Sequence, residues 1–302
     1  MTVTAGIDIG STYVKVVVMK DGRRMGYDVG PTGAYPDNAA MACLKNSLEK
    51  AGLSESDVDY TVSTGYGRRI ASFSDANISE ISANARGSKF IGERFGIRTI
   101  IDIGGQDTKV ISLDESCNMV NFAMNDKCAA GTGRFLEMLA KVLEVPLDQM
   151  GPISLTARDP VEITTTCLVF AKSEVATHLA EGEHKEDIIQ GIHTAIARRL
   201  IVMAKKVGIR EKVFFDGGPA RNIGMVETFK RELNMEIVVP EIPQIVTATG
   251  AAVIAAEIVE NGTSNVPTVP APGKSASGGV LTPQISAPAG TGQSIRDRGS
   301  IR

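Results

Sequence analysis

Residues 7–17 read IDIGSTYVKVV, and residues 101–111 read IDIGGQDTKVI. The second stretch repeats the first at one constant offset, so that Asp8 in the first copy matches Asp102 in the second. Each copy is an apolar segment, a turn of small residues and a β-branched segment, which predicts a β-hairpin. Two matching hairpins in one chain predict two related half-domains that face each other.

The sequence around the hairpins alternates between short apolar segments and segments with apolar residues at helical spacing, which predicts an α/β architecture with mixed sheets flanked by helices. The expected strands cover residues 3–9, 13–19, 23–28, 58–63, 98–103, 107–113, 118–124 and 212–216. The expected helices cover residues 37–51, 79–95, 132–144, 171–181, 186–207, 221–233 and 244–260.

The repeat also divides the chain into domains. We expect a first half-domain over residues 1–97, to which the helix at 244–260 returns, and a second over residues 98–243. Residues 261–302 are rich in Pro, Gly, Ser and Thr and lack apolar periodicity, which predicts a disordered tail.

Composition excludes several classes of partner. The chain has 302 residues and a net charge of −3, and it lacks tryptophan, so neither a nucleic-acid surface nor attraction to an acidic membrane is expected. Residues 1–18 show no basic start followed by an apolar core, and no apolar run is long enough to span a bilayer. We therefore expect a cytoplasmic protein.

The turn of the first hairpin contains residue types that bind phosphate. Gly10 allows the backbone to approach an anion without a clash from Cβ. Backbone N–H groups and the hydroxyls of Ser11 and Thr12 can donate hydrogen bonds to phosphate oxygens, and Lys15 adds positive charge. This turn is therefore a candidate phosphate loop.

The second hairpin carries a corresponding loop. Gly104 and Gly105 again permit close approach, and either Gln106 or Asp107 is a candidate to orient a water that attacks the γ-phosphate. The alternative is a hairpin with an ordinary glycine turn and polar surface residues. The matching aspartate and glycine positions in both copies favour the phosphate loop.

A magnesium site is expected between the hairpins. Asp8 and Asp102 end opposed strands, and hydrated Mg²⁺ keeps several waters while it takes one or two carboxylates.

A third element completes the expected nucleotide site. Residues 214–222 read FFDGGPARN, a buried strand, a double-glycine turn and a helix start. Gly217 and Gly218 would let an adenosine unit lie against the backbone, and the helix start at Asn222 favours a phosphate or ribose oxygen. Two phosphate loops followed by an adenosine loop resemble the actin/sugar-kinase/Hsp70 ATPase superfamily over about residues 3–260. The resemblance implies two ribonuclease H-like half-domains with ATP or ADP in a cleft between them.

Two of the cysteines are candidate metal ligands. Cys128 and Cys167 each precede an expected helix, where the helix dipole lowers a thiol pKa and stabilises a metal–thiolate centre. A [4Fe–4S] cluster takes four thiolates, so a two-fold dimer would have to share it. The other interpretation is that both are small buried residues. Cys43, on the apolar face of an expected helix, and Cys117, in a hairpin connection, are expected to be structural or incidental.

The motifs together resemble the CoA-enzyme activase family, which comprises ATP-dependent activators of 2-hydroxyacyl-CoA dehydratases and ATPase subunits of benzoyl-CoA reductases. The resemblance rests on GIDIGSTYVK, STGYG, IDIGGQDTK, NDKCAAGTGRFLE, TTTCLVFAKSEV and FFDGGPARN. It implies a homodimer or homologous heterodimer with one [4Fe–4S] cluster at its interface, held by Cys128 and Cys167 of each subunit. It also implies that electrons from reduced ferredoxin or flavodoxin pass to an iron–sulfur acyl-CoA reductase or dehydratase component in an ATP-driven step.

Two features favour the benzoyl-CoA reductase subunit, a protein of anaerobic aromatic degradation, over the dehydratase activator. Ala83 and Asn84 stand where a Cys-His pair is associated with many dehydratase activators, and the tail suits a subunit tethered in a larger complex. Two iron-free alternatives of other classes remain, an N-acetylhexosamine-type kinase and a nucleotide-dependent scaffold. The helical histidines, His193 among them, are expected to be surface or packing residues.

Overall fold

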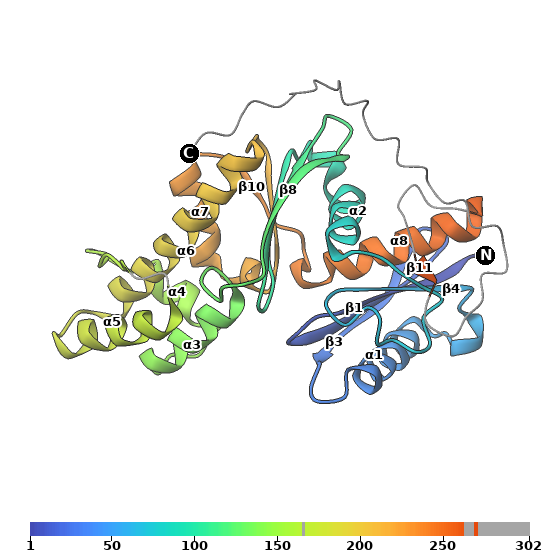
Figure 1. Cartoon of the computed structure of the whole chain (residues 1–302), viewed down its shortest axis with the longest axis horizontal. Helices are drawn as coiled ribbons and strands as arrows, with labels where there is room; N and C mark the ends of the chain where they lie inside the picture. Colours follow the sequence, from blue (N-terminus) through green and yellow to red (C-terminus); the bar gives the residue numbers. More distant parts are fainter. Residues whose placement is uncertain (165–166, 263–268, 271–302) are drawn as a thin grey trace, which may run out of the picture.

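The computed structural model describes residues 1–164, 167–262 and 269–270, and it places most of them in two lobes (Figure 1). The first lobe is built on a mixed sheet in the order β5-β4-β1-β2-β3. Its strands are β1 (Val3–Ile9), β2 (Tyr13–Lys20), β3 (Arg23–Pro31), β4 (Tyr60–Thr64) and β5 (Ala76–Asn77). β1 runs antiparallel to β2 and parallel to β4.

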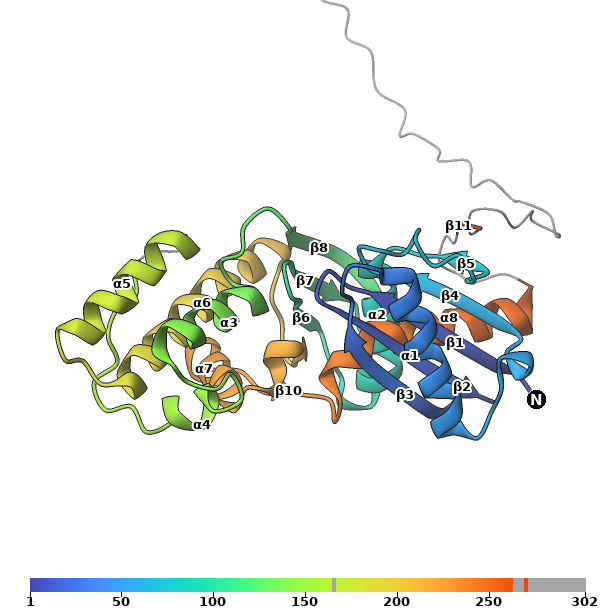
Figure 2. The same cartoon turned by 90° about the horizontal axis from the view of Figure 1, so that it is seen from below.

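Helices cover both faces of the first sheet because its central strands are apolar on both sides. On β2, Val16 and Val18 belong to the core beneath α1 (Pro36–Ala51), whereas Val17 and Met19 belong to the core beneath α8 (Val246–Asn261). Figure 2 shows the two helices on opposite faces of the sheet.

The second lobe repeats this arrangement with the sheet order β10-β9-β6-β7-β8. Its strands are β6 (Thr99–Ile103), β7 (Thr108–Leu113), β8 (Met119–Asn125), β9 (Val213–Gly217) and β10 (Ile237–Val238). Its helices are α3 (Gly133–Leu143), α4 (Met150–Ser154), α5 (Leu168–Ala180), α6 (Lys185–Val207) and α7 (Ile223–Leu233). The α/β architecture with mixed sheets that the sequence predicts is confirmed.

Helix α2 (Glu80–Gly92) crosses α8 between the lobes (Figure 1). The two backbones are close because each helix has a glycine at the crossing. A Cβ on Gly87 would collide with the carbonyl oxygen of Val246, and one on Gly250 would collide with that of Ala83. The crossing is therefore a tightly packed connection between the two halves.

Short 3-10 helices complete the described elements: η1 (Glu55–Asp57), η2 (Glu93–Phe95), η3 (Gly218–Arg221) and η4 (Pro243–Ile245). Most of residues 261–302, predicted to be a disordered tail, lie outside the described residues. Within that range, Asn261 ends α8, and β11 (Val269–Pro270) pairs antiparallel with β5. Among the described residues, no helix is long and apolar enough to cross a membrane.

Candidate nucleotide-binding and catalytic site

The first hairpin places Asp8 and Lys15 opposite each other where β1 and β2 meet the interlobe cleft. The two residues are paired in the antiparallel register, and Lys15 Nζ lies 2.9 Å from Asp8 Oδ2. The turn between the strands is closed by a hydrogen bond of 3.0 Å from the Gly10 N–H to the Tyr13 carbonyl. The Thr32 hydroxyl also donates to the Gly10 carbonyl at 2.7 Å, which fixes the loop from β3.

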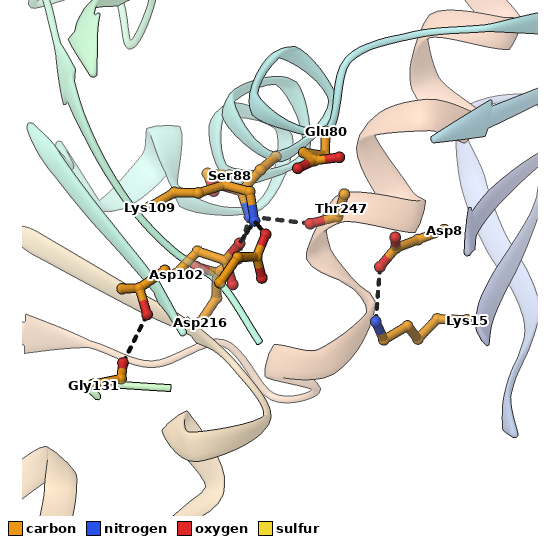
Figure 3. A network of polar contacts seen from close by, with 12 residues as sticks. Asp8, Lys15, Glu80, Ser88, Asp102, Lys109, Gly131, Asp216 and Thr247 are labelled. Carbon is orange, nitrogen blue, oxygen red and sulfur yellow. Dashed lines mark hydrogen bonds and ion pairs between the residues drawn. The ribbon is translucent and has the colours of Figure 1, made fainter. Parts of the chain in front are cut away.

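The second hairpin repeats this geometry with a buried lysine. Lys109 is paired in register with Asp102, and its Nζ lies 3.3 Å from Asp102 Oδ2 and 2.5 Å from Asp107 Oδ2. The Gly104 N–H donates to the Asp107 carbonyl at 2.9 Å and closes the turn. Figure 3 shows Lys109 and Asp102 beside Asp216, with Asp8 and Lys15 on the first lobe.

The two loops meet across the cleft. A Cβ on Gly105 would lie 2.5 Å from the Thr12 hydroxyl oxygen, so glycine is what allows the loops this close approach. Two glycine-containing loops, the first with the Ser11 and Thr12 hydroxyls, thus face one space, as a polyphosphate requires.

The third element enters the same space from β9. Gly217 has a φ of 85°, in the left-handed region that favours glycine, and it turns the chain from β9 into η3. Apart from Gly218 itself and its two chain neighbours, no described residue has an atom within 4 Å of the position that a Cβ on Gly218 would take, so this residue presents open backbone.

The amide of Asn222, predicted to bind cofactor, is engaged within the protein. Its Oδ1 accepts from the Met225 N–H at 3.1 Å and caps α7, and its Nδ2 lies 3.1 Å from Nε2 of the buried His193. These contacts hold the Asn222 side chain in the wall of the cleft. His193 is buried, as expected for a packing residue.

These elements enclose a cleft of about 1020 Å³ between the lobes. It is lined by every residue that the sequence predicts to bind nucleotide or magnesium, namely Asp8, Gly10, Ser11, Thr12, Lys15, Asp102, Gly104, Gly105, Gln106, Asp107, Gly217, Gly218 and Asn222. A second cavity, of about 1150 Å³, lies between residues 160–164 and α6, and none of these loop residues lines it.

Negative charge dominates the cleft. The acidic side chains that line it are Asp8, Glu80, Asp102, Asp107, Asp126, Glu137, Asp148 and Asp216, and the basic ones are Lys15, Arg68, Lys109 and Arg221. Because a nucleotide would add further negative charge, this set fits a polyphosphate that arrives with a divalent cation. Asp8 and Asp102 would hold such a hydrated cation from the two hairpins.

Burial sets the protonation of the acids at the base of the cleft. It raises the pKa of Asp102, an effect that the Lys109 charge opposes, and it raises the pKa of Asp216 well above its ordinary value. Burial also raises the pKa of Glu80 at the start of α2. Burial alone would lower the pKa of Lys109, but the carboxylates of Asp102 and Asp107 outweigh it and keep this lysine charged.

Sequence reasoning missed the residues that support this base. Asn84 on α2 donates from Nδ2 to Asp216 Oδ2 at 2.7 Å and to Thr247 Oγ1 at 3.1 Å. Asp216 in turn is paired in register with Asp102 on the neighbouring strand. The DGG turn gave a signal for Asp216, but nothing local in the sequence links it to Asn84, a contact that depends on the fold.

The two candidate cluster cysteines lie outside the cleft, in the second lobe. Cys128 is half-buried in the loop between β8 and α3, where its carbonyl accepts from Asn125 Nδ2 at 2.9 Å. Cys167 is exposed and directly precedes α5, which packs against α3. The helix begins at Leu168, three residues earlier than the predicted start at residue 171. Cys167 therefore lies directly at the helix N-terminus.

The other two cysteines lie in the hydrophobic cores, away from Cys128 and Cys167. Cys43 and Cys117 are buried in the cores, where burial raises the pKa of both thiols, that of Cys43 to about 11. In the part of the chain that the structure describes, no group of three or more His, Cys, Asp or Glu residues could hold a metal ion. A [4Fe–4S] cluster takes four thiolates, so one shared between two chains would need two from each chain.

Comparison with known proteins agrees with the nucleotide cleft. A model of the BadF/BadG/BcrA/BcrD ATPase family matches residues 5–255. The 2-hydroxyisocaproyl-CoA dehydratase activator of Clostridioides difficile is 46% identical over 252 residues, which cover 83% of this chain and 94% of the relative. A benzoyl-CoA reductase subunit of Thauera aromatica is 32% identical over 239 residues, which cover 77% of this chain and 84% of the relative.

A solved structure gives the same result for the fold. The activator of the 2-hydroxyisocaproyl-CoA dehydratase from Clostridium difficile with bound ADPNP superposes with a TM-score of 0.81 at 44% identity. The superposition covers 88% of this chain and 100% of that chain. The actin-like ATPase fold that the motifs predict is confirmed.

Proposed function

This chain belongs to the BadF/BadG/BcrA/BcrD ATPase family, and from that membership we propose that it is an ATP-hydrolysing activator of a 2-hydroxyacyl-CoA dehydratase. The observation that carries the proposal is the contact between the two phosphate loops at Gly105 and Thr12, within a cleft lined by every predicted nucleotide-binding residue. The activator is a separate protein from the dehydratase that it serves, so a partner enzyme is part of the proposal.

The choice of a dehydratase partner reverses the sequence-based preference for a benzoyl-CoA reductase. The relative named as a dehydratase activator is 46% identical, and the reductase subunit is 32% identical. Ala83 and Asn84, which favoured the reductase, are fully buried at the α2–α8 crossing. Their side chains pack within this chain and do not form a surface that a partner enzyme contacts. The tail lies mostly outside the described residues and does not distinguish the two.

Within the cleft, each element has a distinct task in ATP binding. The backbone N–H groups around Gly10 and Gly104, with the Ser11 and Thr12 hydroxyls, would donate to the phosphate oxygens. Asp8 and Asp102 would hold a hydrated Mg²⁺, which would offset the negative charge of the phosphates. Gly217 turns the chain, and Gly218 after it leaves the backbone open to the adenosine end.

Gln106 is the better candidate to position the attacking water. Asp107 is held by the buried Lys109 in an ion pair of 2.5 Å, so its carboxylate stabilises the loop. Gln106 is exposed on the cleft wall and makes no side-chain hydrogen bond within the described residues. Its amide is free to accept from and donate to a water near the γ-phosphate.

A second copy of the chain, or a homologous subunit, would complete a [4Fe–4S] site with its own Cys128 and Cys167. Such a cluster, when bound, supplies a one-electron carrier. Val169 and Phe170, two and three residues after Cys167, are 69% and 64% exposed, and exposed apolar side chains of this kind support a surface that another chain covers. Reduced ferredoxin or flavodoxin remains the proposed electron donor, and an iron–sulfur acyl-CoA dehydratase component the proposed acceptor.

The experiment that tests the proposal measures iron, acid-labile sulfide, native mass and ATPase activity on protein purified without oxygen. We expect about two irons per chain in a dimer, since a [4Fe–4S] cluster would be divided between two chains. We also expect ATP-dependent activation of a purified 2-hydroxyacyl-CoA dehydratase, with benzoyl-CoA reductase components as the comparison. ATP hydrolysis without iron, together with phosphoryl transfer to an amino sugar, would contradict the proposal and support the kinase.

A further inference from the structure

Asp216 has an oxygen that the protein buries and leaves without a partner. The residue is 1% exposed and lines the nucleotide cleft from the end of β9. Its Oδ2 accepts from Asn84, but within the described residues Oδ1 has no hydrogen-bond partner. A buried acceptor left unpaired is costly, so such atoms in native proteins usually meet a ligand or an ordered water.

The neighbours of Asp216 belong to the expected cation site. Asp102, on the adjacent parallel strand, is in register with it, so the two side chains lie on the same face of the sheet. Lys109 contacts Asp102 and Asp107. No hydrogen bond or ion pair within the described residues joins this lysine to Asp216. Burial raises the pKa of Asp216 and favours its neutral form in the free protein, and the positive charge of a bound cation would oppose that effect and favour the carboxylate. Asp216 is thus left as an acceptor beside the predicted cation.

Asn84 fixes the direction of the Asp216 carboxyl group. Both Nδ2 hydrogens of Asn84 have an acceptor, one in Asp216 and one in Thr247, so the amide cannot turn without breaking a buried hydrogen bond. The helix that carries Asn84 is itself held against α8 by the close contact at Gly87 and Gly250. Asn84, on α2, is therefore a rigid hydrogen-bond donor to the carboxyl group of Asp216, on β9.

We propose that Asp216 is a third carboxylate of the cation site and that Asn84 is its positioning residue, holding Oδ2 so that Oδ1 accepts from a water of the hydrated divalent cation that enters with the nucleotide. This inference rests on the proposed nucleotide site and adds Asp216 and Asn84 to its residues. It also gives the α2–α8 crossing a direct hydrogen bond to the cation site.

The test is calorimetric binding of ADP in the presence of Mg²⁺ and in EDTA, for the parent and for the Asn84→Ala, Asp216→Asn and doubly substituted proteins. The parent should bind ADP more tightly with Mg²⁺. Each single variant should lose about tenfold of that magnesium-dependent affinity, the range expected for one charge-assisted hydrogen bond, and should bind ADP in EDTA as the parent does. The double variant should be no weaker than either single one, because Asn84 acts through Asp216.

Controls separate positioning from folding. Thr249→Ala removes a buried hydroxyl from α8 that donates to the carbonyl of Ile245, the residue directly before this helix, and it should leave both affinities unchanged. Asp216→Asn keeps the shape of the side chain and decides the question if Asn84→Ala does not fold. Equal losses in Mg²⁺ and EDTA, additive losses, or unchanged Mg·ADP affinity would overturn the inference. A parent that binds no nucleotide in either buffer would instead reject the proposed function, and this assignment with it.

Discussion

Lys109 lies directly opposite Asp102 in the second hairpin, and their side chains form an ion pair of 3.3 Å, as Lys15 and Asp8 do at 2.9 Å in the first. The two pairs differ in burial, because the Lys109 side chain is 6% exposed and the Lys15 side chain is 19% exposed. Lys109 also contacts Asp107, so one buried cation serves two carboxylates. The repeat thus gives each candidate phosphate loop its own lysine. The lysine of the second loop, Lys109, is the more deeply buried of the two.

Replacement of Lys109 by methionine should destabilise the protein strongly. It removes the charge that offsets two carboxylates in a buried site, and loss of one partner from such a pair costs about 3–5 kcal/mol. The free energy of unfolding in urea measures this loss. Lys230→Met, which breaks an exposed ion pair with Glu227, should cost about 1 kcal/mol or less. Equal effects of the two substitutions would show that Lys109 has no special place in the loop.

Replacement of Asp8 by asparagine should reduce ATP hydrolysis by roughly tenfold or more at limiting Mg²⁺, because it removes a charged cation ligand. The effect should diminish as the Mg²⁺ concentration rises, which a titration of the initial rate would reveal. Glu227→Gln makes the same chemical change on the exposed face of α7 and should leave the rate unchanged. A rate for Asp8→Asn that equals the parent's at every Mg²⁺ concentration would remove Asp8 from the site.

Gln106 and Asp107 should give different kinetic results. Gln106→Ala removes only the group that positions the water, so kcat should fall by about 10²-fold or more while KM for ATP changes little. Asp107→Asn weakens the bond to Lys109, so it should lower stability as well as the rate. Steady-state kinetics combined with urea unfolding separate the two cases. A fall in kcat for Asp107→Asn alone, with stability intact, would transfer the water-positioning role to Asp107.

Acid should destabilise the second lobe through His193. Burial lowers the pKa of this histidine from 6.5 to about 3 in the folded protein. The unfolded chain therefore binds a proton that the folded chain does not, and the contribution to stability is present above pH 6.5 and lost as the pH falls toward 3.

The slope should reach about 1.4 kcal/mol per pH unit in this window, measured as the free energy of unfolding in urea at a series of pH values. His193→Gln, which keeps an acceptor for Asn222, should remove this part of the slope, and the control His178→Gln on α5 should retain it. Parallel curves for the parent and His193→Gln would contradict the assignment.

The sequence predicts the sheets and the cleft well because the evidence for them is local and repeated. Each hairpin has its own apolar alternation and its own glycine turn, so β1 and β2, like β6 and β7, follow from short segments. The two-residue strands β5 and β10 and the short α4 were missed, since elements of this length carry no periodicity. The first turn of α5 was also missed, because Val169 and Phe170 are exposed and break the amphipathic pattern.

The contacts that complete the site depend on distant parts of the chain. Asn84 meets Asp216 only because α2 crosses α8 between the lobes, and no spacing in the sequence predicts that pair. Asn84 serves this internal hydrogen bond, whereas the preference for a reductase partner rested on the lack of a Cys-His pair at Ala83 and Asn84.

The cysteines give the prediction that separates an electron-transfer activator from an ordinary ATPase. Cys128→Ser and Cys167→Ser should each abolish iron binding in anaerobically purified protein, because each removes two of the four thiolates from a cluster shared by two chains. Folding, followed by circular dichroism, and ADP affinity should be retained, because neither cysteine lines the nucleotide cleft. Cys43→Ala, a substitution of a buried thiol in the first lobe, should keep the full iron content. Full iron in either serine variant would exclude that cysteine as a ligand, whereas loss of iron only in Cys43→Ala would place the metal in the wrong lobe for this proposal.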